Sequence, residues 1–187
     1  MEVIPFTHIK EWLGTTEADA LCATLEARSD WTQGWIRMFG REVPEPRLTF
    51  FEGDPGVRYT YAHRPLEGRG WSPELDALRD RFERDFGIPT NTVLANLYRD
   101  GRDSMGWHRD HEPELGPDPH VVSLSLGASR DFDVRRDADR LTQRFALGHG
   151  DLILMGTESQ TKWTHSIPKR LKIKKLRINL TFRQVIC

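Results

Sequence analysis

The sequence predicts a mainly β protein with flanking helices, an α+β fold with helices in its first half and a β-barrel or jelly roll in its second half. Apolar residues recur at helical spacing in two segments before residue 90, and from Thr92 onward short β-type runs alternate with turn residues. No helical segment separates those runs, so a barrel or sandwich is favoured over a parallel α/β sheet. We expect one domain over residues 1–187, with the helices in 1–90 and the β fold in 91–187.

Two segments of the first half are predicted to be helices. Thr16–Arg28 opens with Thr16 and Asp19 at capping-box spacing and then carries apolar residues on one face. The second helix starts after Ser72, which we expect to cap it, and ends at Gly87. Both patterns are typical of helices that pack one face against a core.

The other predicted elements are strands, bounded by Gly and Pro and rich in β-branched or aromatic residues. Some lie between the helices, and the rest follow the second helix at regular spacing. They are Trp35–Phe39, strands and hairpins within Arg47–Tyr61, then Val93–Tyr98, Val121–Leu126, Phe132–Val134, Asp151–Met155, Lys162–Ile167 and Ile178–Phe182.

Composition excludes several classes of protein. A hydrophobic content of 37% with 29% charged residues is that of an ordinary folded domain rather than a disordered or fibrous chain. No run approaches the ~20 apolar residues of a membrane span, and Met1–Lys10 lacks a signal-peptide pattern. The spacing of Cys22 and Cys187 suggests neither a disulfide framework nor a zinc clip. We therefore expect a monomeric protein of the cytoplasm, and of the nucleus as well if the source is eukaryotic.

Charge is nearly balanced overall but uneven along the chain. The formal net charge of −1 gives no general attraction for nucleic acid. Between Lys169 and Arg177, however, six of nine residues are basic. Such a run is typical of a surface that contacts phosphates, and equally of a solvated loop that leads into a strand. The sequence alone leaves both interpretations open.

Three residues of the second half have the chemistry of a metal site. His108 and Asp110 are two positions apart, so on an extended backbone an imidazole and a carboxylate point to the same side. That pair alone is equally consistent with a surface ion pair. A third ligand of the right type, His165, lies in a later predicted strand. Two imidazoles and one carboxylate leave coordination positions open, as in non-haem Fe(II) oxygenases, although the same set can also bind zinc.

The last predicted strand gathers its polar side chains on one face. Alternation puts Arg177, Asn179, Thr181 and Arg183 on one side and apolar residues on the other. If the polar side faces the core, two buried guanidinium groups need an anion such as a dicarboxylate, because an unpaired buried charge loses most of its hydration. If it faces solvent, no anion is needed. Alternation alone does not decide between the two.

A series of motifs runs through the chain from Pro46 to Ile186. They are Pro46-Arg47, Tyr59-Thr60-Tyr61, Asn96-Leu97-Tyr98, His108-x-Asp110-x-Glu112, Ser123–Gly127, Arg130-x-Phe132, His149-Gly150-Asp151, His165 and Arg177–Arg183. In order and spacing they resemble the AlkB family of Fe(II)- and 2-oxoglutarate-dependent nucleic-acid dealkylases, in particular its branch with the animal DNA-repair homologues. The resemblance implies a double-stranded β-helix, or jelly roll, with an N-terminal nucleotide-recognition lid in residues 1–90.

The resemblance also implies roles for individual residues. The Fe(II) ligands would be His108, Asp110 and His165. The residues that hold 2-oxoglutarate would be Asn96, Tyr98, Arg177, Thr181 and Arg183, with Arg177 assigned to the distal carboxylate. Contacts to the substrate would come from Met38, Phe39, Gly40, Tyr59, Tyr61, His111 and Glu112. His111 departs from the related repair enzymes, which often carry Asp there, so a contact made by this residue would respond to pH.

The implied reaction is oxidative dealkylation of bases such as 1-methyladenine and 3-methylcytosine, in DNA, RNA or both. Fe(II), 2-oxoglutarate and O2 would be required, and succinate, CO2 and formaldehyde would be released. The damaged base must leave the stack to reach a buried metal. Three other functions stay open: a hydroxylase of a protein, lipid or small molecule, a nucleic-acid-binding protein without catalysis, and a zinc hydrolase.

Phe39 is the candidate for a wedge that supports the flipped state. It stands with Met38 between two arginines at a glycine turn, and the segment resembles the finger by which some family members intercalate. The arginines could contact phosphates while the apolar pair enters the gap left by the base. The alternative is a Phe side chain buried in the core below a hairpin.

Overall fold

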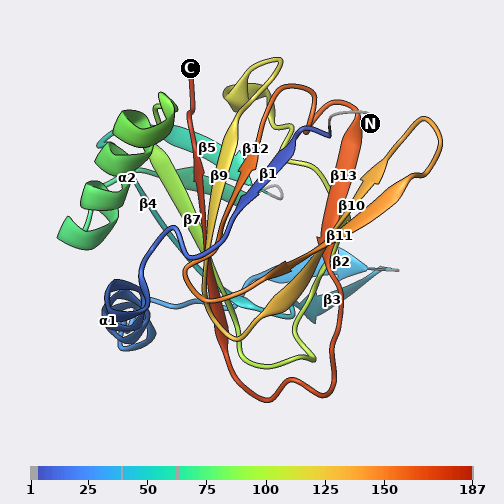
Figure 1. The fold of residues 1–187 in the computed structure, drawn as a ribbon, viewed down its shortest axis with the longest axis horizontal. Helices are drawn as coiled ribbons and strands as arrows, with labels where there is room; N and C mark the ends of the chain where they lie inside the picture. Colours follow the sequence, from blue (N-terminus) through green and yellow to red (C-terminus); the bar gives the residue numbers. More distant parts are fainter. Residues whose placement is uncertain (1–3, 39, 62–63, 187) are drawn as a thin grey trace.

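The computed structural model describes residues 4–38, 40–61 and 64–186, and it consists of two main β-sheets with two helices on one side (Figure 1). The larger sheet has the strand order β1-β12-β9-β14-β7-β4. Its strands are β1 (Phe6–Ile9), β4 (Leu48–Gly53), β7 (Thr92–Tyr98), β9 (Val121–Gly127), β12 (Leu152–Met155) and β14 (Arg177–Arg183). Two of them, β1 and β4, precede residue 91, so the front part of the chain completes this sheet.

The central position of β14 decides which way its polar face points. This strand pairs with β7 on one side and β9 on the other, and all seven of its residues are buried. The side that carries Arg177 and Arg183 therefore faces the interior of the protein. The solvent-exposed alternative for this face is wrong.

The smaller sheet has four strands in the order β11-β10-β13-β8. They are β8 (Met105–His108), β10 (Arg130–Arg136), β11 (Thr142–Leu147) and β13 (Trp163–Ile167). All strand pairs in both sheets are antiparallel, and side chains from both sheets line one cavity between them. This is the predicted jelly roll.

Both predicted helices are present and cover the outer face of the larger sheet. The helices are α1 (Thr15–Glu26) and α2 (Pro73–Phe86), and their apolar residues share one buried cluster with β7, β9 and β14. Gly87 ends α2 in the left-handed conformation at φ 65°, as predicted. A single turn of 3-10 helix, η1 (Pro113–Leu115), follows β8. Neither described helix is long and apolar enough to cross a lipid bilayer.

The predicted helix caps are wrong in detail. The N-cap of α1 is Gly14, and no side chain caps its first turn. Ser72 does occupy the N-cap of α2, but its hydroxyl donates a hydrogen bond to Oε2 of Glu52 at 3.0 Å instead of accepting one from the helix. The carboxylate of Glu52, which is distant in the sequence, therefore binds the hydroxyl group that would otherwise cap the helix.

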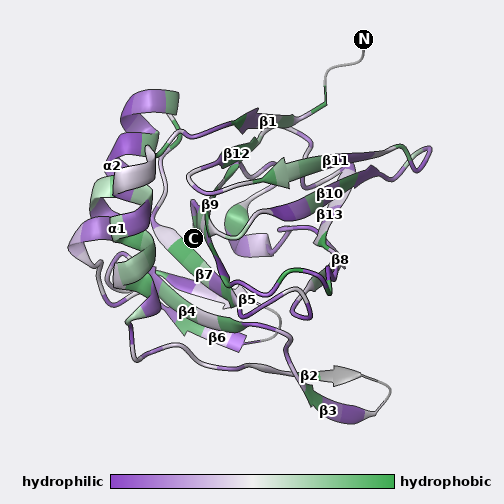
Figure 2. Ribbon diagram, turned by 60° about the horizontal axis from the view of Figure 1, so that its bottom comes forward, coloured by the Kyte–Doolittle hydropathy of each residue, from purple (hydrophilic) through white to green (hydrophobic). Residues whose placement is uncertain are grey.

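Two hairpins complete the fold. They are β2 (Trp35–Met38) with β3 (Arg41–Pro44), and β5 (Arg58–Tyr61) with β6 (Arg64–Glu67). The first hairpin projects away from the body of the molecule (Figure 2). Gly40 lies in its turn with a positive φ of 78°, which glycine adopts without strain. Phe39 lies outside the described residues, so its role as a wedge stays a prediction.

Candidate metal and cosubstrate site

The three candidate metal ligands meet in space. His108 ends β8, Asp110 lies in the loop after it, and His165 is the middle residue of β13. The two histidines pair directly across neighbouring strands. One ligand atom from each of the three side chains lies within 4.8 Å of the others, and no second group of this kind occurs in the described part of the chain. The cluster offers the donor set of an Fe(II) or zinc site.

Both imidazoles are held neutral. Burial lowers the pKa of His165 to about 3. Burial also lowers the pKa of His108, although part of its side chain reaches the surface. Nδ1 of His108 lies 2.9 Å from the carbonyl oxygen of Gly106, which favours a proton on Nδ1 and a free lone pair on Nε2. Neutral imidazoles with free lone pairs are ready to bind a cation.

Asp110 is fixed by two buried partners. Its Oδ1 accepts a hydrogen bond from Nη2 of Arg183 at 2.7 Å, and its backbone N–H donates to Oε1 of Gln160 at 2.8 Å. Burial opposes ionisation of this carboxyl group, but the charge and the hydrogen bond of Arg183 act against burial, and the pKa of Asp110 is lowered. Oδ2 has no hydrogen-bond partner among the described residues and lies 3.8 Å from Nε2 of His165. This oxygen is therefore free to bind a metal.

Arg177, at the other end of β14, has no carboxylate partner among the described residues. It is 1% exposed, and its Nη2 donates a hydrogen bond to Oγ of Ser125 at 2.8 Å. Its Nε and Nη1 make no hydrogen bond to a described residue, although Tyr98 lies close, with its ring centre 5.4 Å from the guanidinium carbon. Burial lowers the pKa of Arg177 to about 10, and Tyr98 offsets this only in part. A buried cation with free donors fits an anionic ligand.

One cavity joins the metal cluster to Arg177. It is lined by Tyr61, Asn96, Tyr98, Met105, His108, Asp110, Ser123, Phe132, Met155, His165, Ile167, Arg177, Asn179, Thr181 and Arg183. This lining includes all three candidate metal ligands and all five residues expected to hold 2-oxoglutarate. Asn179 and Thr181 are linked by a hydrogen bond from the Thr181 hydroxyl to Oδ1 of Asn179 at 3.0 Å.

The residues expected to contact the substrate do not all lie at the cavity. Tyr61 lines the cavity, and Tyr59 lies beside it, each ring centre 5.8 Å from the guanidinium carbon of Arg183. Glu112 is half-buried, and burial raises the pKa of its carboxyl group. His111 is exposed. Met38 is the last residue of β2, and Gly40 lies in the turn of the projecting β2–β3 hairpin.

Comparison with known proteins places this site in a family. A sequence profile of the 2OG-Fe(II) oxygenase superfamily matches residues 5–183. The chain is 36% identical over 184 residues to the human "DNA oxidative demethylase ALKBH2", covering 92% of this chain and 70% of that protein. This chain belongs to the AlkB family of 2OG-Fe(II) oxygenases. It is also 38% identical to the rat "Alpha-ketoglutarate-dependent dioxygenase alkB homolog 3", over 90% of this chain and 60% of the relative.

Solved structures support the fold independently of close sequence similarity. The structure of OsALKBH1 superposes with a TM-score of 0.68 at 18% identity, covering 98% of this chain and all of that one. A 2OG-Fe(II) oxygenase family oxidoreductase from Burkholderia pseudomallei superposes with a TM-score of 0.63 at 16% identity, covering 96% of this chain and 84% of that one. At such identities the likeness speaks for the fold alone.

Family membership defines the class of enzyme and its cofactors. The chain is an Fe(II)- and 2-oxoglutarate-dependent dioxygenase that uses Fe(II), 2-oxoglutarate and O2. Its cavity fits these groups, because it combines neutral imidazoles, the free Oδ2 of Asp110 and the free donors of Arg177. A zinc hydrolase and a nucleic-acid-binding protein without catalysis do not account for this combination.

Proposed function

We propose that this dioxygenase removes alkyl groups from N-alkylated bases of the 1-methyladenine and 3-methylcytosine type in DNA, with RNA as a further substrate to be tested. The observation that carries the proposal is the single cavity that contains both the His–Asp–His cluster and the unpaired donors of Arg177. The names of two similar relatives, both DNA oxidative demethylases, support the choice of substrate. Bound Fe(II), 2-oxoglutarate and O2 would supply the oxidation of the alkyl carbon, with succinate, CO2 and formaldehyde as products.

Within the cavity, each polar residue has a proposed task. His108, Asp110 and His165 hold Fe(II), and Arg183 keeps Asp110 ionised and oriented through the bond of 2.7 Å. The distal carboxylate of 2-oxoglutarate binds to the free donors of Arg177. The remaining residues proposed to hold the cosubstrate are Asn96, Tyr98, Thr181 and Arg183, all of which line the same cavity.

The damaged base is proposed to enter beside Tyr59, Tyr61 and Glu112. Glu112 follows the ligand Asp110 by two residues, and its raised pKa lets it change protonation when a cationic alkylated base arrives. His111 adds an exposed imidazole to the same loop. The two hairpins before residue 91 form the nucleotide-recognition lid, and Met38, Phe39 and Gly40 support the gap left by the flipped base.

The basic run between Lys169 and Arg177 is proposed to contact phosphates. Lys172, Lys174 and Lys175 are exposed in the loop before β14, whereas Arg177 points into the cavity. The exposed lysines supply sequence-independent attraction for a nucleic-acid backbone. We also propose that residues 1–187 form a single domain that acts as a monomer in the cytoplasm, and in the nucleus of a eukaryotic source.

A formaldehyde-release assay tests the proposal. The Fe(II)-loaded protein is incubated with 2-oxoglutarate and with single- and double-stranded DNA and RNA oligonucleotides that carry 1-methyladenine or 3-methylcytosine, with unmethylated oligonucleotides as controls. We expect formaldehyde only with methylated oligonucleotides and only with 2-oxoglutarate present. Turnover of 2-oxoglutarate without formaldehyde from any methylated oligonucleotide would instead support a protein, lipid or small-molecule substrate.

A further inference from the structure

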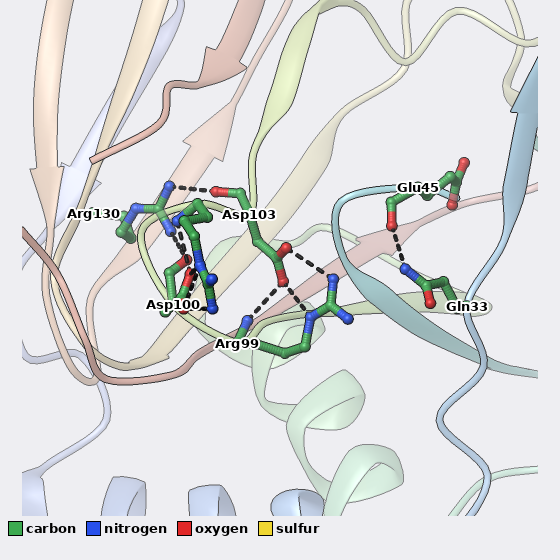
Figure 3. A network of polar contacts seen from close by, with 7 residues as sticks. Gln33, Glu45, Arg99, Asp100, Asp103 and Arg130 are labelled. Atoms are coloured by element: carbon green, nitrogen blue, oxygen red, sulfur yellow. Dashed lines mark hydrogen bonds and ion pairs between the residues drawn. The ribbon is translucent and has the colours of Figure 1, made fainter. Parts of the chain in front are cut away.

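Arg130 occupies the junction between two loops at the Arg177 end of the cavity. It begins β10, is 1% exposed, and does not itself line the cavity. Its guanidinium group donates to three backbone carbonyl oxygens, those of Asp100 at 3.1 Å and of Asp103 and Pro168 at 2.8 Å each. Figure 3 shows Arg130 beside the loop that carries Asp100 and Asp103. The side chain thus ties the β7–β8 loop to the β13–β14 loop.

All three acceptors of Arg130 are neutral. No described residue forms an ion pair with it, and its buried Nε has no hydrogen-bond partner among them. Two other buried arginines differ, since Arg183 pairs with Asp110 and Arg47 lies 3.4 Å from a carboxylate oxygen of Glu45. Burial lowers the pKa of Arg130, and Tyr98, Asp103 and Asp131 offset this only in part. A loop clamp needs hydrogen-bond donors, but it does not need an uncompensated charge.

The positive charge of Arg130 lies close to Arg177. The guanidinium carbon of Arg130 lies 5.6 Å from the ring centre of Tyr98, and that of Arg177 lies 5.4 Å from the same ring. Two buried cations therefore share one aromatic ring at the end of the cavity where Arg177 has free donors. Repulsion from Arg130 contributes to the lowered pKa of Arg177. An anion bound at Arg177 would relieve this repulsion and would be attracted by both charges.

We propose that Arg130 is a positioning residue for 2-oxoglutarate, which it attracts through its charge without touching it. It holds Tyr98 and the two loops around Arg177, and it adds a second positive charge behind the site of the distal carboxylate. The inference rests on the proposed binding of 2-oxoglutarate in this cavity. It makes affinity for the distal carboxylate depend on a residue outside the cavity lining.

Two substitutions separate the charge from the loop contacts. Arg130→Gln keeps amide donors for the carbonyl oxygens but removes the charge, whereas Arg130→Lys keeps the charge with fewer donors. Arg99→Met is the matched control, because Arg99 pairs with the side chain of Asp103 on the same loop but is about half exposed. Binding of 2-oxoglutarate and of 2-oxobutyrate, which lacks the distal carboxylate, is measured by calorimetry on Fe(II)-loaded protein without oxygen. Melting temperatures establish that each variant is folded.

We expect Arg130→Gln to weaken 2-oxoglutarate binding by roughly tenfold, the effect of a unit charge at about 10 Å in a medium of effective dielectric about 20. Binding of 2-oxobutyrate should stay within about twofold, and Arg130→Lys should retain most of the affinity for 2-oxoglutarate. Arg99→Met should bind both compounds like the wild type. If Arg130→Gln does not fold, Arg130→Lys decides, since a tenfold loss in this charged variant contradicts the proposal.

Other results overturn the inference in distinguishable ways. Equal weakening of 2-oxoglutarate and 2-oxobutyrate by Arg130→Gln would mean that Arg130 only supports the loops. Unchanged binding of both compounds would mean that its charge is irrelevant. If the wild-type protein failed to bind 2-oxoglutarate, the failure would lie in the proposed site itself rather than in Arg130.

Discussion

Arg183 and Arg177 lie on the same face of the same strand, yet their surroundings differ. Arg183 donates to Asp110 at 2.7 Å, so its charge is compensated inside the protein, and this bond also fixes a candidate metal ligand. Arg177 has Ser125 as a neutral partner and two nitrogens without a hydrogen bond. One arginine completes the metal end of the cavity, whereas the other leaves the far end ready for an anion. Identical residues in one motif can therefore have a buried counter-charge at one position and none among the described residues at another.

The difference has a thermodynamic consequence. Removing one partner of a buried ion pair leaves the other charge uncompensated, which typically costs 3–5 kcal/mol. The cost of burying Arg177 without a counter-charge is already present in the ligand-free protein. Substitutions at the two positions should consequently separate a loss of stability from a loss of cosubstrate affinity.

The largest expected effect comes from the metal cluster at the Arg183 end of the cavity. His108→Ala, His165→Ala and Asp110→Ala should each abolish formaldehyde release, because two ligands hold Fe(II) too weakly to sustain turnover. Asp110→Ala should in addition lower the free energy of unfolding by roughly 3–5 kcal/mol, since it leaves Arg183 unpaired. Activity assays and denaturant titrations of the three variants test this. Near wild-type activity in Asp110→Ala would move the iron site elsewhere.

The arginine pair itself gives the next effect. Arg177→Ala should raise the 2-oxoglutarate requirement about 10- to 150-fold, which corresponds to the roughly 1.5–3 kcal/mol of a hydrogen bond to a charged group. Arg183→Ala should also weaken binding, but it should destabilise the metal-free protein far more than Arg177→Ala, because Asp110 then loses its partner. Calorimetric titration and thermal melts of both variants make the comparison. Equal losses of stability would remove the distinction between the two ends.

Phe39 offers a smaller effect that concerns the lid rather than the cavity. As a wedge, Phe39→Ala should reduce activity on methylated double-stranded DNA several-fold more than on single strands, where no gap needs support. Thermal stability should stay nearly unchanged. A Phe buried in the core would instead cost about 3–5 kcal/mol on substitution and lower activity on both substrates alike.

Glu112 gives the smallest effect, and it depends on pH. Its native pKa lies above the ordinary value of 4.5, so the unfolded chain releases this proton at lower pH than the native protein. The free energy of unfolding therefore falls as the pH rises from the unfolded-state pKa to the native pKa of Glu112, and it stays reduced above the native pKa. Metal-free Glu112→Gln should accordingly melt higher than the wild type near neutral pH, with the difference vanishing below pH 4.5. A lower melting temperature at neutral pH would show that the carboxylate stabilises Arg183 instead.

Local patterns in the sequence predicted which side chains would come together. The spacing of His108 and Asp110 and the alternation of the last strand are short-range patterns, and the structure brings these side chains and His165 to one cavity. The bond between Asp110 and Arg183 spans 73 positions, and no pattern in the sequence indicates it. For that reason, the alternation of side chains along the last strand predicted the same surroundings for Arg177 and Arg183. The contact of Gln160 with Asp110 was not predicted either, because a single Gln in a turn does not indicate that it will accept a hydrogen bond from the loop of a metal ligand.

In the fold, too, elements with a local sequence pattern were predicted, whereas several elements without such a pattern were not. Both helices and the buried strands follow from apolar periodicity, but β1, β3, β6, β8 and β11 were not predicted. Each lies at the edge of its sheet, and five of the six residues of β11 are at least partly exposed, so its pattern resembles a polar loop. Pairing with β10 decides its conformation. Ser72 stands at the predicted N-cap of α2, but its hydroxyl group binds Glu52, which is distant in the sequence, instead of the helix.

The most direct test of the account is the stoichiometry of a single reaction. Fe(II)-loaded protein is given an oligonucleotide with one 1-methyladenine, and succinate, formaldehyde and restored adenine are quantified together. In this account each turnover consumes one 2-oxoglutarate and dealkylates one base, so the three products should appear in equal amounts. None of them should form without 2-oxoglutarate. Succinate formed without restored adenine, or adenine restored without succinate, would contradict it.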